Sequence, residues 1–177
     1  QVAGLSTSVL NTLETTDFVA LTTTEVNALT TAQLNGLTST TFGVMTTTQI
    51  TSLSTTQVAG LNTTALNRLS TTNVAVLTTT EVNALTTAQL NSLNTTNLGA
   101  LTTTQVTSLS TTQVAGVSTT QLNVLETTDL VALTTTEVNA LTTAQLNGLT
   151  STTLGVMTTT QITSLGTTQI AGLTTTT

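Results

Sequence analysis

Carboxyl and hydroxyl groups are the only side-chain groups in this sequence that could do acid–base or nucleophilic chemistry. The chain has no His, Cys, Lys or Tyr, so its many Ser and Thr hydroxyls lack an activating base. Two nearby carboxylates can share acid–base work, and the closest pair is Glu14 and Asp17, repeated as Glu126 and Asp129 in the stretch "ETTD". Because this pair is also typical of a helix start, we favour that interpretation and expect no catalytic residue and no enzymatic activity.

A metal site would require acidic side chains that cluster. The chain has no D-x-D run of the EF-hand type and no Gly/Asp nonapeptide of the calcium-binding β-roll type. Glu25, Glu81 and Glu137 recur every 56 residues, and could align only if that spacing made whole turns of a coil. We therefore expect no metal site and no cofactor.

The charge balance excludes several classes of partner. Arg68 is the only basic residue, and seven acidic residues bring the net charge to -6. Nucleic-acid binding needs a basic surface, which the chain lacks, and an anionic membrane would repel it weakly. The sequence shows no run of about 18 apolar residues and no signal peptide, so we expect no membrane span.

Apolar residues recur at two fixed positions in every eight. One series, mostly Leu, runs from Leu5 to Leu173, and a second runs from Val2 to Ile170. The consensus octad is L-T-T-T-Q-V-x-x, and we number its slots one to eight from the leucine. Since only 1% of residues are aromatic, a core has to be built from these aliphatic side chains.

A longer repeat lies on top of the octads. The stretch "TTTEVNALTTAQLN" begins at residues 22, 78 and 134, a spacing of 56 residues or seven octads. Residues 6–61, 62–117 and 118–173 are therefore three copies of one block, and residues 1–177 form a single array of about 22 octads. We favour recent duplication of a seven-octad block as the explanation. The alternative is that seven octads are a structural or assembly period.

Each octad carries the signals that start a helix. In residues 21–28, Thr22 is a candidate N-cap, and Glu25 can reach back to the N–H of the cap, as in a capping box. Leu21 and Val26 hold the two positions of a hydrophobic staple. The pattern predicts one very short helix per octad.

The less frequent residues agree with this register. All seven acidic residues fall at the cap or in the first turn, and Arg68 falls in the last slot, as the helix dipole favours. Nine of the ten glycines lie in the last two slots, where small residues let backbones approach closely. Because Gly and Asn tolerate left-handed backbone, we expect them to end the helices in that conformation. Examples are Gly36, Gly43, Gly60, Gly155, Asn27, Asn83 and Asn139.

Helices this short are not stable alone, so they must pack against neighbouring octads. Coiling the chain would line a narrow, continuous core with the two apolar series, which predicts an all-α solenoid of very short helices. A β-solenoid is the alternative, because Thr, Val and Ile favour strands. We favour helices, since apolar spacings of five and three put the two series on opposite faces of a strand.

The Thr triplet in slots two to four is the most regular surface feature. Its second residue is Thr in every octad except at Ser39 and Ser151. We favour a structural explanation, in which a ladder of hydroxyls satisfies backbone groups along the coil. The alternatives are a hydroxyl-and-methyl face that orders water, as in ice-binding repeat proteins, and O-glycosylation of the Thr runs.

The octads, for example "LTTTQVTSLSTTQVAGV" at 101–117, resemble the Thr-rich octapeptide arrays of very long, adhesin-like bacterial cell-surface and secreted proteins. The resemblance covers essentially the whole chain and implies an extracellular, stalk-like, adhesive or filamentous role. Both ends cut through an octad without a polar capping unit, so we expect a segment of a longer array or a protomer that stacks end to end. We predict a structural protein whose partner is itself; the alternative is a module that binds ice or glycans through a Thr face.

Overall fold

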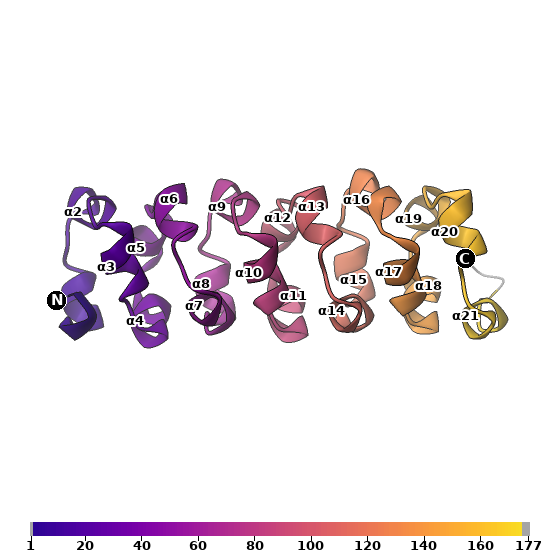
Figure 1. Cartoon of the computed structure of the whole chain (residues 1–177), viewed down its shortest axis with the longest axis horizontal. Helices are drawn as coiled ribbons and strands as arrows, with labels where there is room; N and C mark the ends of the chain where they lie inside the picture. The colour runs from indigo at the N-terminus through magenta and orange to yellow at the C-terminus, as the bar shows by residue number, and fades with distance from the viewer. Residues whose placement is uncertain (1, 175–177) are drawn as a thin grey trace. The chain divides into compact units, whose positions relative to one another are not determined.

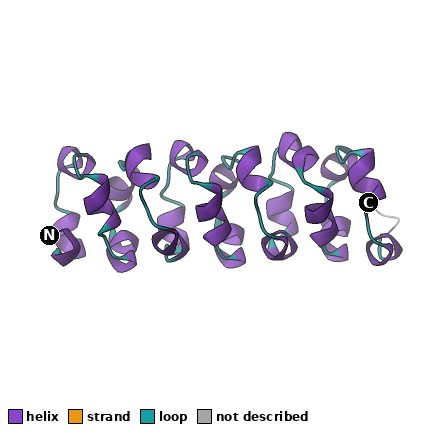
Figure 2. Ribbon diagram, in the orientation of Figure 1, coloured by secondary structure: helices purple, strands orange, loops and turns teal. Residues whose placement is uncertain are grey.

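The chain is built from very short helices joined by turns of two to four residues. The structure, a computed structural model, describes residues 2–174, and in that range it contains 21 α-helices of four to six residues, one 3₁₀ helix and no strand (Figure 2). The predicted all-α class is confirmed, and the β-solenoid alternative is wrong. The elements are η1 (Val2–Gly4), α1 (Thr7–Leu10), α2 (Thr15–Val19), α3 (Thr23–Asn27), α4 (Thr31–Gly36), α5 (Ser39–Gly43), α6 (Thr47–Ile50), α7 (Thr55–Ala59), α8 (Thr63–Leu66), α9 (Thr71–Ala75), α10 (Thr79–Ala84), α11 (Thr87–Ser92), α12 (Thr95–Leu98), α13 (Thr103–Val106), α14 (Thr111–Gly116), α15 (Thr119–Leu122), α16 (Thr127–Ala132), α17 (Thr135–Ala140), α18 (Thr143–Gly148), α19 (Ser151–Gly155), α20 (Thr159–Thr163) and α21 (Thr167–Ala171).

The helices begin where the sequence predicts, at the second residue of each Thr triplet. In α3 the hydroxyl of Thr22 accepts from the N–H of Glu25, and the Glu25 carboxylate accepts from the N–H of Thr22, so the predicted capping box is present. Among the described α-helices, only α2, α16 and α21 lack a side-chain cap; their cap residues are Glu14, Glu126 and Gly166. A side-chain cap stabilises a helix by about 1 kcal/mol, which is large for a helix of one turn.

The helices do not end in the predicted left-handed conformation. No residue between 2 and 174, glycine or otherwise, has a positive φ. The residue after a helix is either right-handed, as Ala28 is (φ -77°, ψ -11°), or already extended, as Leu37 is (φ -62°, ψ 144°). The extended leucine leads directly into the next cap, so the turn needs no left-handed residue. The left-handed prediction is therefore wrong for all seven example residues, Gly36, Gly43, Gly60, Gly155, Asn27, Asn83 and Asn139.

The two predicted apolar series form the core. Slot six supplies side chains with no exposed surface, such as Phe18, Leu34 and Phe42, and slot one supplies nearly buried leucines such as Leu29, which is 2% exposed. Burying one such side chain contributes roughly 1.5–3 kcal/mol. Slot-five side chains are also buried in most octads, which the sequence reasoning did not predict.

Each octad packs against octads three and four positions away along the chain. Helix α3 packs against α6, and α7 against α10, which are three octads apart, whereas α4 also packs against α8, four octads away. The chain therefore coils with about 3.5 octads per turn, as a solenoid does (Figure 1). Seven octads, the length of one 56-residue block, then make about two turns.

Two compact units make up the described part of the chain. The first contains η1 and α1 to α12 and ends at Ala100, and the second contains α13 to α21 and begins at Leu101. Each unit taken by itself is an α-solenoid of stacked octads. Within residues 2–174, no helix is long and apolar enough to cross a membrane.

Candidate functional site

The slot-five glutamine is the side chain that joins one turn of the coil to the next. Oε1 of Gln57 accepts from the backbone N–H of its own cap residue, Ser54, at 2.8 Å. Its Nε2 donates to the carbonyl oxygens of Val26 and Asn27 at 3.2 and 3.1 Å, four octads earlier, and to that of Leu29 at 2.7 Å, three octads earlier. The side chain is only 5% exposed, so these bonds are shielded from water. We call this arrangement the glutamine clamp.

Half of the clamp was predicted from the sequence. The slot-five residue was assigned to the capping box, which holds for Gln33, Gln49 and Gln145, but the bonds made by Nε2 were not predicted. The missed signal was the excess of Gln over Glu in slot five. A carboxylate caps a helix as well as an amide does, but only the amide carries a second group that donates.

In some octads where slot five is not Gln, another donor replaces the clamp. Asn73 donates to the carbonyl oxygen of Met45 at 2.9 Å, 28 residues earlier. Slot five of α8 holds Ala65, which cannot donate, and there the guanidinium of Arg68 donates to the carbonyl oxygen of Leu37. Arg68 therefore donates to the carbonyl oxygen that a slot-five amide would otherwise bind. It also lies near a helix C-terminus, as predicted.

A slot-seven asparagine bonds in the opposite direction, to the octads three and four positions later. Nδ2 of Asn35 donates to the carbonyl oxygen of Gly60 at 2.8 Å. Its Oδ1 accepts from the N–H of Asn62 at 2.7 Å. Asn62 is the cap of the helix that has Ala65 in slot five, so Asn35 supplies the acceptor that a glutamine would otherwise provide. Asn11 has the same role for Thr38, the cap of the helix that has Thr41 in slot five. Nδ2 of Asn11 donates to the carbonyl oxygen of Gly36, and its Oδ1 accepts from the N–H of Thr38.

The strict second Thr of the triplet packs against the next turn. A Cβ added to Gly148 would lie 2.6 Å from Cγ2 of Thr119, and one added to Gly60 would lie 2.5 Å from Cγ2 of Thr31. These glycines therefore lie at a close approach between turns, as expected from the sequence for small residues in these slots. By contrast, Gly155 has open space around it, and its slot has no packing explanation.

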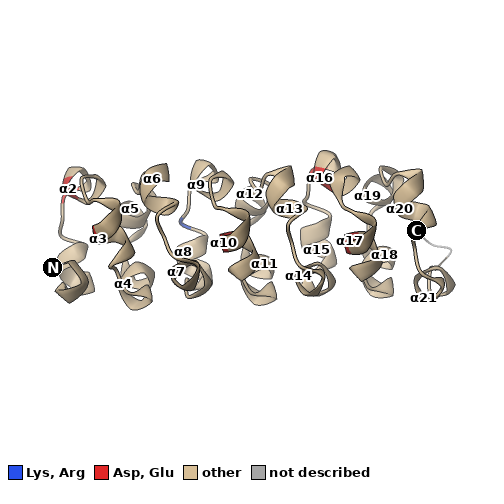
Figure 3. Ribbon diagram, in the orientation of Figure 1, with Lys and Arg blue, Asp and Glu red and all other residues tan. Residues whose placement is uncertain are grey.

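The acidic pairs lie at separate helix starts, as the sequence reasoning favoured (Figure 3). Glu14 and Glu126 are the cap residues of α2 and α16, and Asp17 and Asp129 lie in the first turns. Asp129 is 3% exposed, and its Oδ1 accepts a 2.7 Å bond from the hydroxyl of Thr103, on a neighbouring turn. This carboxylate therefore serves as an acceptor between turns.

The three glutamates of slot five occupy equivalent places in α3, α10 and α17. The N–H and the hydroxyl of Thr22 donate to Glu25, and these bonds hold the pKa of Glu25 below its ordinary value of 4.5. Oε2 of Glu137 accepts from the N–H of Thr134 at 2.7 Å, whereas its Oε1 is buried without a hydrogen-bond partner. In the described residues, no three acidic side chains are close enough to hold a metal ion.

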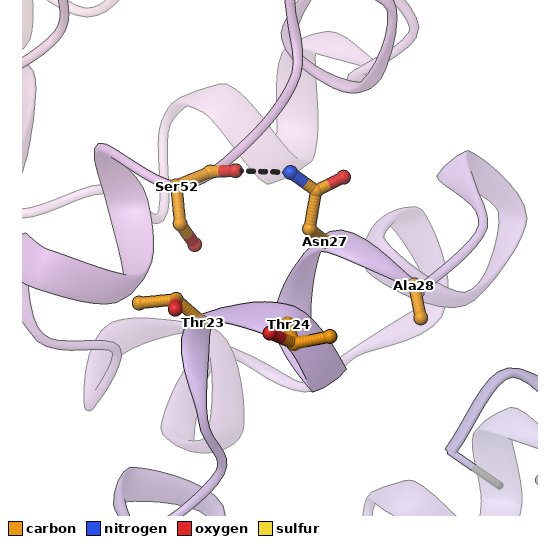
Figure 4. Close-up of a pocket in the computed structure, with 5 residues that line it drawn as sticks. All are labelled: Thr23, Thr24, Asn27, Ala28 and Ser52. Carbon is orange, nitrogen blue, oxygen red and sulfur yellow. Dashed lines mark hydrogen bonds between the residues drawn. The ribbon is translucent and has the colours of Figure 1, made fainter.

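A shallow hollow lies between α3 and α6 in the first unit (Figure 4). Its volume is about 540 Å³, and it is lined by hydroxyl, amide and methyl groups. Nδ2 of Asn27 donates to the carbonyl oxygen of Ser52 at 2.7 Å and closes one side of it. The lining residues are Thr23, Thr24, Asn27, Ala28 and Ser52. The hollow offers uncharged polar contacts and no group with acid–base function.

These features define a solenoid repeat protein, in which each short helix contacts octads of the adjacent turns. The family model of the ALTTAQ repeat matches residues 10–47, 74–111, 82–119 and 122–159, which together cover more than half of the chain. The chain therefore belongs to the ALTTAQ repeat family, and the letters ALTTAQ occur in it at 28–33, 84–89 and 140–145. The predicted repeat protein is thereby confirmed. No curated protein matches the sequence.

Proposed function

We propose that the chain is a structural segment of an extracellular filament, fibre or surface stalk, and that its function is to provide length. The observation that carries this proposal is the glutamine clamp, which recurs with one geometry in both units. Nε2 of Gln49 reaches carbonyl oxygens 28 to 31 residues earlier in the first unit, and Nε2 of Gln161 does so in the second. Because each further octad with Gln in slot five can make the same bonds, such an array can be lengthened without a new kind of contact.

Enzymatic activity is no part of this proposal. The carboxylates of Glu25, Glu81 and Glu137 act as helix caps, and the carboxylate of Asp129 accepts a bond between turns. No His, Cys or Lys is present to complete a catalytic group. Because the chain lacks these residues and has a single basic side chain, we propose no cofactor and no nucleic-acid partner.

We also propose that the chain associates with itself, end to end or side by side. Slot four is exposed in every described α-helix and never holds a charged residue, so the same uncharged side chains recur along each unit and are available to a second copy.

Labelling of intact cells tests the location and the form of the assembly. We expect antibodies against the purified chain to decorate the outside of unpermeabilised cells of the source organism, on fibres visible by negative-stain electron microscopy. Label that appears only after permeabilisation would contradict the extracellular role. Surface label without any elongated structure would contradict the filament and stalk.

A second candidate function is binding of ice or of glycans through a Thr face. It is favoured by slot four, the third residue of the triplet, which is exposed in every described α-helix, as Thr24, Thr56 and Thr136 illustrate. Thermal hysteresis at micromolar protein concentration would support ice binding. Its absence, together with fibres by electron microscopy, would support the structural role instead.

A further inference from the structure

The second 56-residue copy differs from the first in some octads and hardly at all in others. Octads 21–36 and 45–60 differ from their counterparts 56 residues later only at Gly36, Met45 and Ile50. Met45 and Ile50 are buried in the core, so Gly36 is the single exposed difference. Octads 5–20 and 37–44, in contrast, differ from their counterparts at more than half of their positions.

The coil places these two sets of octads on opposite sides. At about 3.5 octads per turn, successive octads are rotated by about 100°, so the octads of α6, α3, α7 and α4 follow one another around the axis. The contacts agree, since α17 packs against both α14 and α20, and α18 packs against α21. The octads of α1, α5 and α2 fill the remaining arc. In Figure 1, α3, α6 and α10 lie towards the viewer in the first unit and α5, α8 and α12 lie behind them.

We use the name repeated face for the exposed side chains of α3, α4, α6 and α7 and of their counterparts. The counterparts are α10 and α11 in the first unit, and α13, α14, α17, α18, α20 and α21 in the second. Each unit by itself presents such a face. Its exposed residues are mainly Thr, Asn, Ser, Ala and Gly.

The exposed acidic residues of the described chain are Glu14, Asp17 and Glu126, and all three lie off the repeated face. Arg68 follows α8, and the acidic pairs belong to α2 and α16, which are all on the opposite side. On the repeated face itself, Glu81 is 3% and Glu137 4% exposed, and Glu25 is half-buried against its cap. For a chain with a net charge of -6, this is the side on which two copies approach without close like charges.

We propose that the repeated face binds the repeated face of a second copy of this chain, side by side. The inference rests on the self-association in the proposed function and names the surface that carries it. A partner that contacts equivalent residues two turns apart needs the same spacing itself, and a second copy has it. The hollow between α3 and α6 receives side chains of that copy, and its five lining residues recur with the same identities at Thr135, Thr136, Asn139, Ala140 and Ser164 in the second unit.

Two triple variants of the full chain test this proposal. The first, T24E/T80E/T136E, adds three charges to the repeated face at slot four of α3, α10 and α17. The second, T16E/T72E/T128E, adds the same charges at the same slot of α2, α9 and α16, on the opposite side. All six residues are exposed, and each is the second residue of its helix, where a carboxylate is favourable. Circular dichroism checks that both variants keep their helix content.

Sedimentation equilibrium from micromolar to millimolar protein gives the dissociation constant of each protein. We expect the wild-type chain and the T16E/T72E/T128E variant to associate with similar constants, and the T24E/T80E/T136E variant to associate at least about tenfold more weakly, since like charges would meet across the interface. A monomeric wild-type chain, or equal weakening by both variants, would overturn the proposal.

Other results separate this inference from the proposed function. Association that neither variant weakens would show end-to-end contact. This result would agree with the proposed filament and would overturn side-by-side binding through the repeated face. Binding of the wild-type chain to a glycan array that is lost only in T24E/T80E/T136E would assign the face to glycans and overturn the pairing of two copies. Cytosolic location with dimers intact would overturn the extracellular role alone.

Discussion

A single donor group on a buried side chain distinguishes the residues that connect turns from those that only cap a helix. Gln145 and Glu137 occupy the same slot in consecutive octads and both cap their helices. Nε2 of Gln145 also donates to the carbonyl oxygens of Val114 and Val117 at 2.7 and 2.6 Å, whereas Oε1 of Glu137 has no partner. A buried polar atom without a partner costs about 1–3 kcal/mol.

Glu137→Gln is therefore expected to stabilise the chain by about 1–2 kcal/mol, because the new amide can donate to carbonyl oxygens of the octad four positions earlier. Urea unfolding followed by circular dichroism measures the change. Glu25→Gln is the matched control, since Glu25 caps its helix in the same way but is half-exposed in the first turn of the coil. Equal effects of the two substitutions would argue against the glutamine clamp.

Two glycines at the ends of neighbouring helices should respond differently to alanine. Gly148→Ala places a Cβ 2.6 Å from Cγ2 of Thr119 and should destabilise the second unit, whereas Gly155 has open space around it. Gly155→Ala should stabilise the chain by about 0.5–1 kcal/mol through helix propensity. Melting temperatures compare the two. Thr119→Ser should recover part of the stability lost in Gly148→Ala; no recovery would show that the close contact is not the cause.

At the scale of the helix, no element of this chain could exist alone. Helices of four to six residues are below the length at which isolated helices form, so caps and contacts between turns must stabilise them. The slot-five glutamine contributes to both, because one end of its side chain caps its own helix and the other end binds carbonyl groups of another turn. The helix and the stacking of the coil therefore form together.

Gln49→Glu separates these two contributions. The carboxylate can still accept from the N–H of Thr46, as Glu25 does from Thr22, but the donor to the carbonyl oxygens of Phe18, Val19 and Leu21 is lost. We expect a loss of about 2–3 kcal/mol in the free energy of unfolding, because buried acceptors then face each other. Chemical denaturation of the full chain gives the value. A variant as stable as the wild type would show that the cap alone matters.

At the scale of the whole molecule, the separation between bonded residues sets which changes of length the array tolerates. Clamp bonds join residues 28 to 31 apart, and asparagine bonds join residues 25 to 27 apart. Both sets of separations are preserved only if residues are added or removed in whole octads. The 56-residue block satisfies this rule, and it also returns the chain to the same side of the coil after about two turns.

Deletion of residues 62–117 should therefore leave a chain with the same helix content per residue and a single cooperative transition. Deletion of residues 62–113 removes nearly as much sequence but not a whole number of octads. Because this deletion shifts the octad register, the leucines after the junction fall at positions that belong to another slot. The shortened chain should therefore lose helix content around the junction. Far-ultraviolet circular dichroism and hydrogen exchange compare the two chains, and equal behaviour would contradict the strict octad register.

The sequence alone determined what is local. The Thr22 cap with Glu25, the staple of Leu21 and Val26, and the first-turn acids follow from bonds within one octad, and these were read correctly because they need no knowledge of the next turn. The two apolar series required a shared core, and hence a solenoid. The prediction of left-handed helix ends was wrong. Glycine can be favoured because it adopts left-handed backbone or because it lacks a Cβ, and at Gly148 only the second reason applies.

The tertiary structure alone decided what depends on the pitch of the coil. Neither the number of octads per turn nor the target of a slot-five amide can be read from one octad, because the donor and its carbonyl acceptors are 28 to 31 residues apart. The same is true of Arg68, whose bond to Leu37 replaces a clamp, and of Gly148, which faces Thr119. Local sequence specifies the helix, whereas contacts between turns specify which side chains meet and which side of the coil each octad occupies.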